Sequence, residues 1–254
     1  MGIPMNYVAL DIETTGLNPK YDKIIEIGAV RVRDGKAEDT FSSFANPAKS
    51  LPTRIIELTG IQDADVCKAP YIDEVLDAFL TFAGDDVLLG HNLIFDYSFV
   101  KKAAVNCKKS YERTGIDTIK IAKCFLGDLE SRSLGFLCEY FQIALDAHRA
   151  LNDAIAAHTL YQILAQKYGN VETKPFQPRQ LVYNVRKENP ITPKQLELLL
   201  KLIVQYHLQR EGYLLSPVVN VTEDTIDLQK LSKNEASRLI DKLLSNFRRS
   251  YPLR

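Results

Sequence analysis

The sequence lacks several features that would assign a chain to a particular class. Its four cysteines form no C-x-x-C pair and have no regular spacing, so we expect reduced core residues rather than disulfides or zinc ligands. No apolar run approaches the roughly 20 residues that a membrane-spanning helix needs. Residues 1–7 lack a basic stretch followed by an apolar segment, so we expect no secretory signal and a cytoplasmic protein without membrane contact.

The chain also lacks a net charge, because 32 basic residues face 32 acidic ones. The composition therefore gives no overall attraction to nucleic acid. The distribution is less even, since acidic residues prevail in residues 1–168 and basic residues in 169–254. A hydrophobic share of 46% and a charged share of 25% are those of an ordinary globular protein. A length of 254 residues suits one domain of about 150 residues with an appendage.

The first part of the chain has the pattern of an antiparallel sheet. Residues 7–12 form an apolar run of the buried-strand kind, and residues 23–33 are rich in Ile and Val. Asp34-Gly35 is a hairpin turn signal, and a third strand is expected through residues 41–44. Three strands with short connections predict a meander at one side of a sheet.

After Pro70 the pattern becomes helical. An apolar stripe predicts a helix, and residues 87–89 predict a short buried strand. Further helices are expected around residues 99–103 and over 117–125, 133–141 and 150–168. Alternation of strands and helices predicts an α/β domain over residues 1–168, with a mixed sheet flanked by helices.

The remainder of the chain is predicted to be a small helical unit behind a linker. Residues 169–190 contain prolines and scattered charge without a sustained period, which indicates a linker. Thr192-Pro193 is typical of a helix start, and Ser232 and Glu235 have the spacing of a capping box. Helices are therefore expected through about Gln209 and Asn246, in a unit spanning residues 191–254.

The segment D-I-E-T-T-G-L at residues 11–17 is the most informative one. Residues two apart on a strand point to the same face, so Asp11 and Glu13 present their carboxylates side by side. Two unit charges about 4 Å apart repel by roughly 4 kcal/mol at an effective dielectric of 20. A divalent cation with a preference for oxygen ligands removes this repulsion. A strand end with two solvated acids has the same pattern, so the pair alone does not decide.

Two later clusters combine histidine with aspartate. H-N-L-I-F-D at residues 91–96 directly follows the short buried strand, and H-R-A-L-N-D at 148–153 begins the long helix. Asp96 could equally be the N-cap of the following helix, and Asp153 a favourable charge near its helix N-terminus. His148 precedes its helix on a loop, where we expect it to be accessible.

The three clusters together resemble the DEDDh exonuclease family of the ribonuclease-H-like fold, over about residues 5–168. The family's motifs are D-x-E-T-T-G-L, followed by I-I-E-I-G-A-V, then H-N-x-x-F-D and H-x-A-x-x-D, and they stand here at residues 11–17, 24–30, 91–96 and 148–153. L-T-G-I at 58–61 and I-D-T at 116–118 are also similar. The epsilon proofreading subunits of bacterial DNA polymerase III are similar through this region. A histidine five residues before the last aspartate indicates the His-type branch, since the Tyr-type branch has tyrosine where Arg149 stands.

The resemblance implies a metal-dependent 3′-to-5′ exonuclease that hydrolyses single-stranded DNA or RNA ends to nucleoside 5′-monophosphates. Asp11, Glu13, Asp96 and Asp153 would hold two Mg²⁺ or Mn²⁺ ions. His148 would act as the general base, a task that suits the titration range of histidine.

Contacts to the terminal nucleotides follow from the same resemblance. Thr14 and Thr15 would offer hydroxyl and backbone donors, and Asn92 would bind the backbone near the site or the substrate. Leu17 and Phe95 would contact the last bases. Aromatic stacking of this kind does not depend on the base sequence. Phe95 could equally fill the core before its helix. His91 is expected to be structural.

The role of the C-terminal unit stays open at this point. It is loosely similar to a short helical module of bacterial and phage proteins, and its basic balance would suit guidance of a polyanion. Docking of a replication or repair protein, or a stabilising cap, fits equally well. For the whole chain, two alternatives to the predicted enzyme are a non-catalytic end-binding scaffold and an RNA-specific exoribonuclease.

Overall fold

The computed structural model describes residues 2–146, 148–207, 218–221 and 224–250. The chain divides into two compact units, one of Met1–Pro47 and Leu51–Val185, and a smaller one of Ala48–Ser50 and Arg186–Arg254. Each unit has its own buried apolar cluster. Within the described ranges, no helix is both long and apolar enough to cross a membrane.

The larger unit is built on a six-stranded mixed sheet with the strand order β3-β2-β1-β4-β5-β6. The strands are β1 (Tyr7–Thr14), β2 (Ile24–Arg33), β3 (Lys36–Phe44), β4 (Leu88–Gly90), β5 (Thr114–Asp117) and β6 (Arg179–Gln180). The first three strands are antiparallel, β4 and β5 run parallel to β1, and β6 is antiparallel to β5. This confirms the predicted meander. Asp34 and Gly35 both have positive φ, as the turn between β2 and β3 requires.

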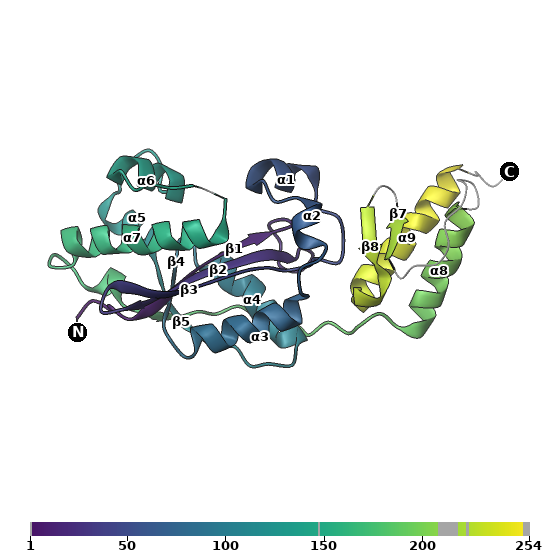
Figure 1. The fold of residues 1–254 in the computed structure, drawn as a ribbon, viewed down its shortest axis with the longest axis horizontal. Helices are drawn as coiled ribbons and strands as arrows, with labels where there is room; N and C mark the ends of the chain where they lie inside the picture. The colour runs from purple at the N-terminus through teal and green to yellow at the C-terminus, as the bar shows by residue number, and fades with distance from the viewer. Residues whose placement is uncertain (1, 147, 208–217, 222–223, 251–254) are drawn as a thin grey trace. The chain divides into compact units, whose positions relative to one another are not determined.

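Helices cover both faces of this sheet (Figure 1). They are α1 (Thr53–Thr59), α2 (Asp63–Val66), α3 (Ile72–Ala83), α4 (Ile94–Asn106), α5 (Thr118–Phe125), α6 (Leu134–Phe141) and α7 (Ala150–Tyr168). Helices α3 and α4 pack on one face, and α5, α6 and α7 pack on the other. The predicted mixed sheet flanked by helices is confirmed.

The alternation of β1 sets the direction of its acidic residues. Leu10 packs in the core shared with α3 and α4, whereas Tyr7 and Ala9 pack in the core shared with α7. Side chains two apart on a strand share a face. Asp11 and Glu13 therefore continue the row of Tyr7 and Ala9, on the side of the sheet that α7 covers.

The segment predicted as a linker, residues 169–190, is largely part of the larger unit. It contains a short 3-10 helix, η1 (Lys174–Phe176), and the strand β6, which pairs with β5. Phe176 is fully buried beside α5 and α7, and Leu181 is buried in the opposite core. A two-residue strand and a single helical turn have no period that a sequence pattern could reveal, which is why the linker prediction extended too far.

The smaller unit contains the two predicted helices and an additional hairpin. Its elements are β7 (Val218–Val221), β8 (Asp224–Asp227), η2 (Leu228–Lys230), α8 (Pro193–His207) and α9 (Lys233–Ser250), with β7 antiparallel to β8. Ser232 and Glu235 exchange both hydrogen bonds of a capping box at the start of α9. Thr192 and Gln195 do the same at the start of α8. Residues 208–209, the predicted end of α8, lie outside the described residues.

The cysteines are only partly where the sequence predicted them. All four are free thiols, as expected. Cys138 is buried and Cys107 is half-buried, but Cys67 and Cys124 are exposed. The expectation of core residues is therefore wrong for two of the four.

Candidate active site

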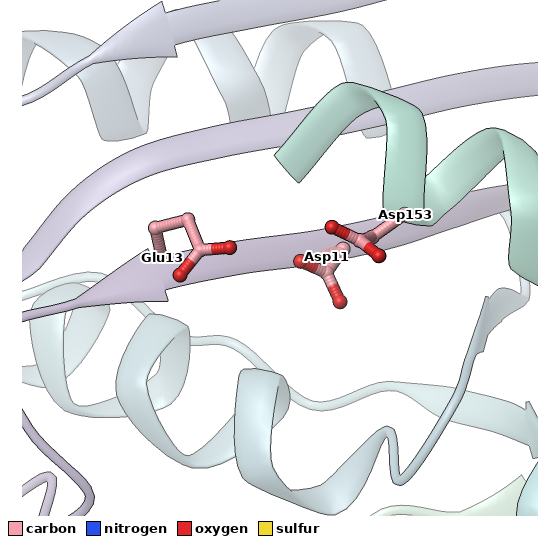
Figure 2. A group of neighbouring side chains, drawn as sticks. All are labelled: Asp11, Glu13 and Asp153. Carbon is pink, nitrogen blue, oxygen red and sulfur yellow. The ribbon is translucent and has the colours of Figure 1, made fainter. Parts of the chain in front are cut away.

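Three carboxylates converge where β1 meets the start of α7. Asp11 and Glu13 lie near the end of β1, and Asp153 lies in the first turn of α7. Each offers an oxygen atom, and these three oxygens lie within 4.8 Å of one another. Figure 2 shows the three side chains facing one another from the strand and the helix. The chain thus brings together two acids from one strand and a third that follows about 140 positions later.

Asp96 completes the acidic group from the other side of β1. It lies in the first turn of α4, is buried, and lines the same pocket as the other three acids. Its Oδ1 accepts a hydrogen bond of 3.1 Å from the backbone N–H of Ile12. The N-cap of α4 is Leu93, without a side-chain cap. The capping role that the sequence left open for Asp96 is therefore not found.

A single pocket contains all the predicted catalytic residues. Its lining consists of Asp11, Ile12, Glu13, His91, Phe95, Asp96, Leu134, His148 and Asp153. The acids come from β1, α4 and α7, and the apolar wall from α4 and α6. Carboxylates beside apolar side chains can hold cations next to an apolar part of a ligand.

The electrostatics of this pocket favour a bound cation. Burial raises the pKa of Asp11 well above its ordinary value, and the neighbouring acids, first of all Asp96, raise that pKa further. Burial, then Asp153, raises the pKa of Glu13 to about 8, although Arg149 acts in the opposite direction. The pKa values of Asp96 and Asp153 are also raised, mainly by burial. These carboxylates raise one another's pKa values because their negative charges repel. A divalent cation bound between them would stabilise their ionised forms.

His148 stands at the edge of the pocket on the loop before α7, as the sequence predicted. Its side chain is exposed, and its backbone is in the left-handed region with φ 67°. Its backbone N–H donates a hydrogen bond of 2.9 Å to Oδ2 of Asp153. The backbone contact fixes this residue beside the carboxylate while the imidazole remains accessible.

The two threonines of the first motif use their hydroxyl groups within their own loop. Thr14 Oγ1 donates to the carbonyl of Gly16 at 2.7 Å. Thr15 is buried, and its Oγ1 accepts from the backbone N–H of Lys23 at 3.0 Å. Both side chains shape the turn between β1 and β2 and lie outside the pocket lining. Both hydroxyl groups are thus engaged in this turn, and the contacts of Thr14 and Thr15 to a substrate, which include backbone donors, stay a prediction.

The apolar candidates are better placed for a substrate. Leu17 is 74% exposed on the same loop. Phe95 lines the pocket and is supported from behind by Phe99, with ring centroids 5.1 Å apart. Asn92 is exposed with φ 66°, and its backbone N–H donates to Oδ1 of Asp117. Asn92 therefore serves the turn after β4, for which a left-handed asparagine is well suited.

Residues 8–161 match the model of the Exonuclease family, RNase_T. The match covers more than half of the chain. The chain belongs to the RNase_T exonuclease family. This confirms the predicted family and identifies the protein as a nuclease enzyme; its family and its acidic cluster both indicate divalent metal binding.

Relatives of this exonuclease occur within larger polymerases. The chain is 41% identical over 162 residues to a PolC-type DNA polymerase III of Clostridium perfringens, a match of 63% of this chain and 11% of that protein. The chain thus spans about a tenth of the length of this relative. Two solved structures share the fold: Exonuclease X in complex with 5′ overhanging duplex DNA, and the nuclease domain of 3′hExo, a DEDDh family member bound to rAMP. The first has a TM-score of 0.54 at 24% identity, covering 64% of this chain and 93% of that one. The second has 0.58 at 20% identity, covering 70% and 98%.

Several residues of the exonuclease site were not identified from the sequence. Glu26 on β2 and Arg149 before α7 form an ion pair next to the acids. Leu134, at the start of α6, contributes to the pocket wall. His91 also lines the pocket, but its two ring nitrogens are hydrogen-bonded to Thr118 Oγ1 and to the carbonyl of Arg132, so its predicted structural role fits these contacts.

Proposed function

We propose that this exonuclease removes nucleotides from the 3′ end of single-stranded DNA and releases nucleoside 5′-monophosphates. The observation that carries the proposal is the meeting of four carboxylates and an exposed histidine in one pocket. Each of the five comes from one of the three motifs that the sequence places in family order. The PolC-type relatives, which are DNA polymerases by name, favour DNA over RNA as the substrate.

The residues of the pocket fit a pair of divalent cations, Mg²⁺ or Mn²⁺. Asp11, Glu13 and Asp153 supply oxygens within 4.8 Å of one another, and Asp96 adds a fourth carboxylate. Hard oxygen donors without a sulfur or imidazole ligand suit these ions. When bound, such cations neutralise the acids and polarise the terminal phosphate.

The protein itself supplies a base and a binding wall for the reaction. The accessible imidazole of His148 takes the proton of the attacking water, as a general base requires. Its backbone contact to Asp153 holds this residue at the pocket edge. Phe95, with Leu17 on the loop after β1, contacts the terminal bases by stacking and apolar contact, which does not depend on sequence.

The direct test uses two labelled forms of one DNA strand. With Mn²⁺, a 3′-labelled strand should release its label as a mononucleotide, while a 5′-labelled strand should shorten in steps. EDTA should abolish both reactions. His148→Ala should lower kcat by about 10²–10⁴, whereas Glu38→Gln, a substitution of an exposed β3 residue, should leave kcat unchanged. Wild-type turnover by the His148 variant would remove this residue from the mechanism.

Two other outcomes lead to the alternative functions. Binding of ends without metal-dependent shortening would identify an end-binding scaffold. Faster hydrolysis of RNA than of DNA, in a matched panel of single and double strands, would identify an exoribonuclease. The comparison with EDTA therefore decides whether hydrolysis occurs, and the panel decides which sugar and which strandedness the enzyme prefers.

A further inference from the structure

A fifth carboxylate lies beside the pocket. Glu26 on β2 is directly opposite Glu13 of β1 in the strand register, and its side chain is 2% exposed. An unpaired buried charge at this position would cost several kcal/mol. What Glu26 binds therefore determines what it does.

Both oxygens of the Glu26 carboxylate accept hydrogen bonds from residues at the start of α7. Oε2 accepts a hydrogen bond of 3.1 Å from the backbone N–H of Ala150, the first residue of the helix. Oε1 forms an ion pair with Nη2 of Arg149 at 3.1 Å, and Nε of the same guanidinium lies 3.3 Å from Oε1. The first N–H groups of a helix have no partner within the helix, so an acceptor fixed on the sheet anchors the helix end.

Gly28, two positions further along β2 and on the same face as Glu26, contributes to the same contact. A Cβ atom at Gly28 would collide with the backbone of Ala150 and Leu151. The first turn of α7 thus rests directly on the backbone of β2. Gly28 allows the helix end to lie close to the sheet, and Glu26 fixes where along β2 it lies.

The anchored turn lies between two residues of the proposed mechanism. His148 precedes Arg149 and Ala150, and Asp153 follows them by one turn. The hydrogen bond from the backbone of His148 to Asp153 connects the two across the anchored residues. A shift of Ala150 relative to β2 would therefore move the base and one acid together, away from Asp11 and Glu13.

We propose that Glu26 is a positioning residue, which acts through Arg149 and Ala150 to hold His148 and Asp153 against the acids of β1. The inference rests on the proposed function, since it assigns Glu26 to that same site. Glu26 differs from the metal-binding candidates because both of its oxygens already have donors from α7 and Arg149. Arg149 also offsets part of the negative charge that this fifth acid brings beside the pocket.

The test is a comparison of kcat, KM and melting temperature for three single variants with DNA and Mn²⁺. Glu26→Gln keeps an oxygen for the N–H of Ala150 but loses the ion pair with Arg149. Arg149→Met removes the same ion pair from the other side. Because the Arg149 side chain is 47% exposed, this second variant tests the contact even if Glu26→Gln does not fold. We expect kcat to fall by about 10–100-fold in both, with KM within about 3-fold, because a displacement of about 1 Å has effects of this size. The control is Asp86→Asn, which breaks the Arg33–Asp86 ion pair before β4 and should lower the melting temperature without changing kcat.

A double variant separates positioning from general destabilisation. In the His148→Ala background, Glu26→Gln should reduce the residual kcat by a smaller factor than in wild type, because the part of its effect that acts through His148 is already lost and only the part through Asp153 remains. A full second loss in this background, or wild-type kcat in Glu26→Gln and Arg149→Met, would overturn the inference alone. An inactive wild-type protein would overturn the proposed function and the inference with it. A His148→Ala variant as active as wild type would remove His148 from the mechanism and overturn the inference, while the exonuclease function would stand.

Discussion

Replacing Glu13 by glutamine should stabilise the metal-free protein while it damages metal binding. Burial and the neighbouring acids raise the pKa of Glu13 from 4.5 to about 8. Between these two values the unfolded carboxyl has lost its proton and the folded one has kept it, so the free energy of unfolding falls as the pH rises. At pH 7 this cost is up to about 3 kcal/mol, and at pH 5 it is below about 1 kcal/mol. Glutamine carries no such cost.

The assay is calorimetric melting in EDTA, since a chain with two compact units can give two transitions. Glutamine loses the attraction to Arg149, so we expect a net gain of roughly 1–3 kcal/mol at pH 8, or about 2–10 °C in the Tm of the exonuclease unit. The gain should become small at pH 5. Glu38→Gln, the exposed control on β3, should show neither the gain nor its pH dependence.

Addition of Mn²⁺ should reverse the order of the melting temperatures, so that wild type melts above Glu13→Gln. A ligand at 100 times its Kd stabilises the folded state by about 2.7 kcal/mol, and wild type, which has all four acids, should gain more than the Glu13 variant. The reasoning is refuted if the variant melts at or below wild type in EDTA at pH 8, or if its advantage is the same at pH 5.

Three further predictions concern other parts of the site. Asp96→Asn keeps an oxygen for the N–H of Ile12, so it should fold normally but lose at least about 100-fold in kcat, measured on labelled DNA. His148→Ala should keep the Mn²⁺-induced rise in Tm, because the proposed base is not a metal ligand. Loss of that rise would show that His148 binds the metal. Gly28→Ala should lower the unfolding free energy by roughly 1–3 kcal/mol and reduce kcat, because the new Cβ collides with α7. Gly135→Ala, with nothing near its Cβ in α6, should change stability by less than about 1 kcal/mol.

The parts of the fold that the sequence predicted are those with a long, regular pattern. The strand over residues 24–33 and the helix over 150–168 have enough residues for a period to be visible. The short elements were missed for the opposite reason. β5 contains four residues, and its last one, Asp117, is also the N-cap of α5, so the sequence pattern indicated only the helix.

The site shows the same limit at the level of single residues. Asp11 and Glu13 could be predicted as neighbours because strand alternation is local. The role of Glu26 depends on its register opposite Glu13 and on a helix end that follows 124 residues later. The apolar run around this glutamate indicates a buried strand, but nothing local reveals what its carboxylate binds. The hydroxyl of Thr14 likewise has a local partner, Gly16, which the motif alone does not reveal.

The return of the chain to the sheet after α7 has a practical consequence for fragments of this protein. A fragment ending at Tyr168 would retain every catalytic candidate but lose Phe176 and Leu181, one from each of the two apolar cores. It would also leave the outer edge of β5 open to pairing with other chains. Expression of the nuclease alone should therefore extend to Val185, where the larger unit ends.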